Sequence, residues 1–95
     1  MKDLEQLRLQ IDHVDNQLMH VLLKRFELLD KIIELKIKNN LPTHDPDREQ
    51  KILKNILADI QRLIPENTPA SQLKIEALMT TFETALKESL HYCQK

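Results

Sequence analysis

The chain has 95 residues, of which 41% are hydrophobic and 31% charged, with no glycine, no tryptophan and only 3% aromatic residues. Because strands favour β-branched and aromatic residues and tight hairpins need glycine, this composition argues against a β-fold. The 14 basic and 15 acidic residues leave a net charge of −1, which favours neither nucleic acid nor an anionic membrane as a partner. We therefore expect one helical domain spanning residues 1–95, without a nucleic-acid or membrane partner.

The expected cellular compartment follows from what the sequence lacks. Cys93 is the single cysteine, so no internal disulfide can form and a reducing compartment is expected. The first residues, Met1–Glu5, lack the apolar run of a secretory signal, and no apolar stretch reaches the roughly 18 residues of a membrane span. The sequence predicts a soluble, cytoplasmic protein.

The first segment predicts one long helix. Its apolar residues recur at steps of three and four, which is typical of one helical face. They are Leu4, Leu7, Ile11, Val14, Leu18, Leu22, Leu29 and Ile32, with one step of seven, which is three plus four, between Leu22 and Leu29. No proline or glycine interrupts the pattern before Pro42, so the helix is expected from about Asp3 to about Asn39, roughly 50 Å long. The remaining sequence is too short to cover such a helix, and we expect it to pair with a second chain.

Two shorter helices are predicted after the first loop. Asp45 is expected to be the N-cap of the second helix, with Pro46 at its first position, and Thr68 and Pro69 are expected to begin the third. The apolar stripes are Ile52, Leu53, Ile56, Leu57, Ile60 and Leu63 in the second helix and Leu73, Ala77, Leu78, Phe82, Ala85 and Leu86 in the third. The third helix is expected to end near Tyr92. The predicted fold class is all-α, with three helices per chain, one long and two shorter, in an intertwined helical homodimer.

Polar residues interrupt the apolar faces at several positions. Arg25 and Lys36 lie eleven residues apart, so they share one face of the first helix within roughly 20°. Inward cations need anionic partners, because a buried unpaired charge is strongly destabilising. Ser89 and Cys93 continue the stripe of the third helix at a spacing of four. Arg25 and Lys36 either bind an anionic ligand or belong to interior ion pairs, and their long side chains can also extend outward to solvent. The carboxylates available for such pairs are Glu34, Asp45 and Glu49.

Arg8 lies too far from Arg25 for both to serve one site in one chain. Seventeen residues separate them, which is about 25 Å along a helix and roughly 100° around it. A single small ligand cannot contact both side chains. If Arg8 belongs to a site, that site is the partner chain's, which again predicts a dimer.

Taken in order, these residues resemble the all-helical (type II, bacterial) class of chorismate mutases over essentially the whole chain. The matching elements are Leu7-Arg8-Leu9-Gln10-Ile11 with Asp12 and Asp15, Lys24-Arg25-Phe26-Glu27-Leu28, Lys36, Asp45-Pro46-Asp47-Arg48-Glu49, and Phe82 leading to Ser89. The resemblance implies a homodimeric enzyme that converts chorismate to prephenate by an intramolecular Claisen rearrangement in phenylalanine and tyrosine biosynthesis. It implies no cofactor and no metal. We also expect no attached dehydratase, dehydrogenase or synthase domain.

The resemblance implies a role for each site residue. It assigns substrate binding to Arg8, Arg25, Lys36, Asp45, Glu49, Ser89 and Cys93. It assigns catalysis to Lys36, Arg48, Glu49 and Cys93. Arg8 would reach into the neighbouring subunit's site, and Arg25 would bind a substrate carboxylate in the cavity of its own chain. Lys36 would donate to the ether oxygen and a carboxylate. Asp45 and Glu49 would hold the substrate hydroxyl and order the site, with Arg48 between them as a structural or ligand-facing cation.

The match is less complete near the end of the chain. Ser89 matches the family's serine near a carboxylate, but four residues later the family usually has Gln, sometimes Glu, where this chain has Cys93. A thiol is shorter than Gln and a weak donor. Two neighbouring residues could supply the missing donor instead. Gln94 is directed about 140° away from Ser89 around a regular helix, and Tyr92 is better directed but bulky. Removing one preorganised donor commonly costs about 10² to 10³ in rate, so we expect measurable but weakened mutase activity.

Other functions fit the same fold. Isochorismate pyruvate-lyase uses this scaffold on a close isomer, although Asp45-x-x-Arg48-Glu49 resembles the mutase pattern, and mutases of amino-substituted chorismate are a further option. A non-catalytic dimeric helical module is the alternative that Cys93 favours. The four histidines form no recognised ligand spacing with Cys93, so no metal site is expected. Of these histidines, His44 is expected to border the pocket.

Overall fold

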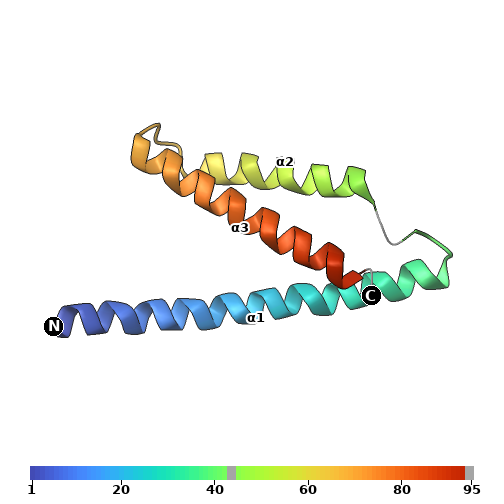
Figure 1. The fold of residues 1–95 in the computed structure, drawn as a ribbon, viewed down its shortest axis with the longest axis horizontal. Helices are drawn as coiled ribbons and strands as arrows, with labels where there is room; N and C mark the ends of the chain where they lie inside the picture. The colour runs from blue at the N-terminus through green and yellow to red at the C-terminus, as the bar shows by residue number, and fades with distance from the viewer. Residues whose placement is uncertain (43–44, 94–95) are drawn as a thin grey trace.

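The computed structural model describes residues 1–42 and 45–93 and contains three helices in these ranges, with no strand (Figure 1). They are α1 (Lys2–Lys38), α2 (Pro46–Leu63) and α3 (Pro69–Cys93). The predicted all-α class and the order of one long and two shorter helices are confirmed, and each predicted helix end lies within about two residues of the observed one.

Asparagine residues end α1, close to the predicted position. Asn40 has a positive φ of 55°, a conformation that asparagine tolerates better than most residues. Its N–H donates to the carbonyl of Ile37, and the N–H of Leu41 donates to the carbonyl of Lys36. This pair of bonds is the Schellman motif, which satisfies carbonyls left open at a helix end. The chain therefore turns away from the α1 axis at Asn40, two residues after the helix ends.

The two shorter helices begin at the predicted caps. The Asp45 carboxylate accepts a hydrogen bond from the N–H of Arg48 at 3.2 Å, and Pro46 occupies the first turn of α2. The Thr68 hydroxyl accepts from the N–H of Ser71 at 3.1 Å. Both bonds satisfy N–H groups that have no partner within the helix. The caps fix where α2 and α3 start, and hence which of their side chains face α1.

The helices α2 and α3 form an antiparallel hairpin, and the last turns of α3 cross α1 (Figure 1). Within the described residues, the backbone of α1 packs against α3 and not against α2. The buried apolar side chains are Ile60 of α2 and Ile75 of α3, at 5% and 9% exposure. The core therefore lies inside the hairpin, whereas α1 has no buried residue.

The single chain is far more extended than a compact domain of its length. Its radius of gyration is 17.0 Å, and its extents are 56 × 30 × 18 Å. A compact domain of 95 residues has a radius of gyration of about 12 Å. The difference comes from α1, whose first half lies apart from the hairpin and whose first turns extend past the end of it (Figure 1). Apolar side chains more than half exposed on this part of α1 include Leu7, Ile11, Val14 and Leu18.

No helix within residues 1–42 and 45–93 combines the length and apolar content needed to cross a lipid bilayer.

Candidate active site

A cavity of about 580 Å³ lies where the end of α3, the second half of α1 and the start of α2 meet. This volume includes space that is open to solvent. The charged and polar lining residues are Arg25, Lys36, Asp45, Arg48, Glu49, Ser89 and Cys93. The apolar lining residues are Leu29, Ile32, Ile33, Ile52, Leu86 and Leu90. The cavity thus combines apolar walls with three cationic side chains and two carboxylates.

The helix α1 contributes the two cations that share a face. Arg25 and Lys36 are both half-buried, and Leu29 and Ile32 lie between them in the sequence and line the same cavity. Since α1 is unbroken from Lys2 to Lys38, its regular turn brings these residues to one side, as their spacing predicts. Long cationic side chains in such a position can bury their hydrocarbon stems while the charged ends stay in contact with water.

The first turn of α2 contributes residues of both charges. Asp45 lines the cavity and also caps α2 through Oδ1. A carboxylate has two oxygens that each accept hydrogen bonds, so the cap leaves acceptor capacity for a ligand. Arg48 is exposed and Glu49 is half-buried, and both line the cavity. Because the cap fixes the start of α2, it also fixes the direction of these two side chains.

Ser89 connects α3 to the first of the α1 cations. It is only 7% exposed, its hydroxyl accepts a hydrogen bond from Nη1 of Arg25, and it donates to the carbonyl of Ala85 at 2.8 Å. The guanidinium is thereby held by a group that is itself fixed on the helix. Cys93, one turn later, is half-buried and lines the same cavity.

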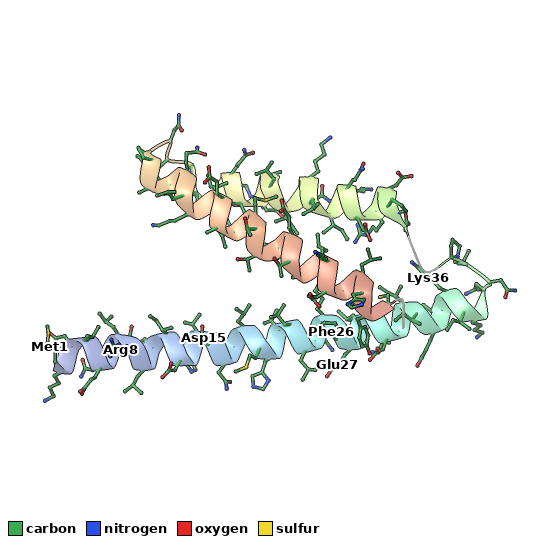
Figure 2. All side chains as sticks on the ribbon, in the orientation of Figure 1. Met1, Arg8, Asp15, Phe26, Glu27 and Lys36 are labelled. Atoms are coloured by element: carbon green, nitrogen blue, oxygen red, sulfur yellow. The ribbon has the colours of Figure 1, made fainter. Side chains whose placement is uncertain are left out.

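Arg8 is the one predicted site residue that lies away from the cavity. It is exposed, and the unbroken helix places it about 25 Å along the axis from Arg25. In Figure 2, Arg8 and Lys36 lie towards opposite ends of α1. Within one chain, the structure therefore brings together the other seven predicted residues and leaves Arg8 apart.

The cavity is open on its α1–α2 side. An adjoining cavity of about 850 Å³ shares Arg25, Lys36, Asp45 and Arg48 with the first and adds Leu28. The helices α1 and α2 do not pack against each other within the described residues, and residues of both helices line this adjoining space. The site is a groove in one chain rather than a closed pocket.

Sequence reasoning missed a polar contact beside the cavity. The Tyr92 hydroxyl donates a hydrogen bond of 2.6 Å to Oδ1 of Asp30, and its ring meets the ring of Phe26 edge to face at a centroid distance of 5.0 Å. The hydrogen bond to the Asp30 carboxylate, together with its negative charge, raises the pKa of Tyr92 above 10.0. Because its hydroxyl is bonded to Asp30, Tyr92 does not act as the hydrogen-bond donor that would replace the family's Gln at position 93. Gln94, the other candidate, and His44 lie outside the described residues.

The residues within 1–42 and 45–93 include no group of three His, Cys, Asp or Glu side chains that could hold a metal ion. The cavity's own chemistry is cationic and hydrogen-bonding. Arginines bind carboxylates through a planar pair of N–H groups, and a lysine adds a compact positive charge. Such an arrangement suits a small molecule that carries two negative groups on an apolar frame.

Comparisons with known proteins agree with this chemistry. The sequence matches the family described as chorismate mutase type II over residues 7–93. The bifunctional chorismate mutase/prephenate dehydratase of Aquifex aeolicus is 42% identical over 57 residues, which are 60% of this chain and 16% of that protein. The T-protein of Haemophilus influenzae is 32% identical over 82 residues, or 86% of this chain and 20% of that protein. No solved structure matches the chain significantly.

The matched part of these relatives is at most a fifth of their own length. The family match, in contrast, includes most of α1, all of α2 and α3, and every residue that lines the cavity. The chain therefore belongs to the chorismate mutase type II family, which is a family of isomerases.

Proposed function

We propose that this protein is a chorismate mutase that rearranges chorismate to prephenate in phenylalanine and tyrosine biosynthesis. The observation that carries the proposal is the grouping of Arg25, Lys36 and Arg48 around one apolar-walled cavity. Chorismate is a compact dianion whose rearrangement needs no nucleophile, metal or obligatory proton transfer. Catalysis then consists of holding one conformation and stabilising the charge that develops on the breaking ether oxygen. The residues of the cavity offer both functions.

The three cations, Arg25, Lys36 and Arg48, have different proposed roles in binding and catalysis. Arg25, oriented by Ser89, binds a substrate carboxylate through its remaining N–H groups. Lys36 donates to the ether oxygen and to a carboxylate, so its charge is the main electrostatic stabilisation of the transition state. Arg48, at the open side of the cavity, is exposed and contacts the ligand as it enters and binds. Each of these charges is already near the cavity before the ligand arrives.

The two carboxylates order the hydroxyl end of the substrate. Asp45 and Glu49 accept hydrogen bonds from the substrate hydroxyl and from neighbouring donors, which fixes one orientation of the ring. Glu49 is half-buried and lies in the turn of α2 that the Asp45 cap begins. Both roles rest on the family's pattern at these positions, and the lining of the cavity supports them.

Cys93 makes this a weak catalyst. It lies in the last turn of α3, in the lining of the cavity, where the family usually has Gln. A thiol donates a hydrogen bond poorly and reaches less far than an amide. One of the two donors to the ether oxygen is therefore largely lost, and turnover is lower by about 10² to 10³ than with a full donor.

The functional unit we propose is a homodimer in which each α1 covers the other subunit's groove. The exposed apolar side chains of α1, Leu7 to Leu18, form a stripe longer than a soluble monomer normally leaves in water. A second copy is the natural partner because two identical stripes can bury each other around a twofold axis. The partner's α1 then closes the open α1–α2 side of the groove and brings its Arg8 to the ligand.

The proposed enzyme is a single domain over residues 1–95 that uses no cofactor and works in the cytoplasm, where its one cysteine stays reduced.

The deciding experiment is an assay of the purified chain with saturating chorismate and, side by side, with isochorismate. We expect prephenate from chorismate above the uncatalysed rate and no pyruvate from isochorismate. Pyruvate from isochorismate would instead identify the lyase. If neither substrate gives a product, the chain is not an enzyme of either kind, and the non-catalytic helical module is the remaining alternative.

A thermal-shift measurement separates a weak enzyme from a non-binder. A bicyclic diacid analogue of the transition state is expected to raise the melting temperature as its concentration exceeds Kd, because a ligand that binds only the folded state stabilises it. A chain that has lost the site shows no shift at any concentration.

A further inference from the structure

The contact between Tyr92 and α1 lies directly beside the cavity but outside its lining. Tyr92 donates to the Asp30 carboxylate at 2.6 Å and packs edge to face on Phe26, with 75° between the rings. The two bonded residues are 62 positions apart in the sequence. Figure 2 places Phe26 where the end of α3 meets α1. This contact therefore joins the last turn of α3 to the second half of α1.

The contact runs parallel to the one inside the cavity. On α1, Phe26 and Asp30 are four residues apart and form one row, while Arg25 and Leu29 form the adjacent row that lines the cavity. On α3, Tyr92 lies three residues after Ser89, so the two side chains leave neighbouring parts of the same face. Tyr92–Asp30 on the outside and Ser89–Arg25 on the inside thus fasten the same crossing of two helices.

This crossing is confined to the end of α3. The backbone of α1 packs against no described helix other than α3, and only near the end of α3. The last turn of a helix tends to fray, because its carbonyl groups have no partner within the helix. If that turn opened, Cys93 would leave the cavity and Ser89 would lose its hold on Arg25. An anchor at Tyr92 prevents this.

We infer that Tyr92 is a positioning residue, whose hydrogen bond to Asp30 holds the last turn of α3 on α1 and thereby keeps Ser89 and Cys93 in the cavity. The part of this inference that concerns turnover rests on the proposed mutase function. The part that concerns the hydrogen bond between Tyr92 and Asp30 is independent of that function, because it concerns only how α3 is held on α1. The experiment below tests the two parts separately.

Tyr92 can be observed without a label. It is the only tyrosine, and the sequence has no tryptophan, so the near-ultraviolet absorbance of tyrosinate reports this residue alone. The groups that act on it are Asp30 from α1 and Cys93 from its own helix, and the carboxylate raises its pKa. In the wild-type protein we expect the titration midpoint above 10.0. In Asp30→Ala it returns to the ordinary value, with folding at each pH checked by circular dichroism.

Hydrogen exchange then tests the positioning itself. Tyr92→Phe keeps the ring on Phe26 and removes only the hydroxyl, and we expect faster exchange of the backbone amides of residues 89–93 in this variant and in Asp30→Ala. Lys31→Ala, which changes the exposed neighbour of Asp30, serves as the control and leaves these amides protected. An unchanged midpoint in Asp30→Ala, or unchanged exchange in Tyr92→Phe, overturns the inference whatever the activity of the protein.

Kinetics link the anchor to turnover. Because one hydrogen bond is removed, Tyr92→Phe and Asp30→Ala are each expected to lower kcat/KM by about 3- to 10-fold. The double variant is expected to be no worse than either one, since both changes break the same bond. Asp30→Asn, whose amide oxygen still accepts the hydrogen bond, restores most of the activity. Additive losses, or no rescue by Asn, contradict the role in turnover, whereas an inactive wild-type protein contradicts only the proposed function.

Discussion

Arg25 of α1 donates a hydrogen bond to the hydroxyl of Ser89 on α3, across 64 residues of sequence. The same hydroxyl donates to the carbonyl of Ala85, so it is fixed on its own helix before it accepts from the guanidinium. A guanidinium has five N–H groups, and the contact with Ser89 engages one nitrogen. The others remain for a ligand carboxylate in the cavity. In the proposed function, Ser89 therefore acts on the ligand mainly by orienting Arg25.

The Ser89→Ala variant is expected to bind substrate less well but to keep its turnover. Loss of the hydroxyl frees Arg25 to sample other rotamers, so KM rises by about 3- to 10-fold, the effect of one hydrogen bond, while kcat changes by less than about twofold. Steady-state kinetics with chorismate provide the measurement. Thr84→Ala is the matched control, because Thr84 makes the same type of bond to the carbonyl four residues before it, at 2.9 Å, and lies outside the cavity. A large fall in kcat for Ser89→Ala contradicts this view.

The Lys36→Ala variant is expected to lose nearly all turnover. Lys36 is the donor that we assign to the ether oxygen, and removing one such preorganised donor lowers kcat by about 10² to 10³. Because Cys93 is a poor second donor, no other group compensates. Lys38→Ala is the control, since both lysines lie in the last turn of α1 and both changes remove one charge from that helix end. If the two variants turn over chorismate equally well, Lys36 is not the catalytic cation.

Much of this architecture could be predicted from the sequence, because its signals are local. The periodic apolar residues mark the helices, and Asn40, Asp45 and Thr68 end or begin them through bonds to backbone groups three residues away. The face shared by Arg25 and Lys36 follows from helix geometry alone. Local signals of this kind need no knowledge of the tertiary fold.

Other features could not be predicted, because they depend on how the helices cross. Asp30 and Tyr92 are exposed polar residues on separate helices, and nothing in their spacing indicates that they meet. The dimer remains a prediction, since the sequence and the single chain both leave the apolar stripe of α1 without a partner.

The Cys93→Gln variant is expected to be a better enzyme than the natural sequence. An amide at this position supplies the second donor to the ether oxygen, so kcat increases, by up to about 10². Cys93→Ala is the control, and because a thiol is a weak donor its kcat is expected to stay within about threefold of that of the natural protein. The measurement is the rate of prephenate formation at saturating chorismate. No gain in Cys93→Gln means that another residue already provides the second donor.

Subunit mixing tests whether Arg8 completes the partner's site. Arg8→Ala and Lys36→Ala are each expected to be inactive as homodimers. In a mixed dimer, the chain with Ala at position 8 keeps its own cavity and receives Arg8 from the other chain, so one of the two sites is intact. Random exchange makes about half of the dimers mixed, which restores about a quarter of the wild-type activity.

The control for this experiment is a mixture of Arg25→Ala with Lys36→Ala. Both residues line the cavity of their own chain, so each site in a mixed dimer carries one of the two changes and none is intact. This mixture is therefore expected to stay inactive. If Arg8 instead served its own chain, the mixture of Arg8→Ala with Lys36→Ala would behave like the control. The contrast between the two mixtures thus tests the dimer and the donated arginine at once, because a monomer cannot complement in either.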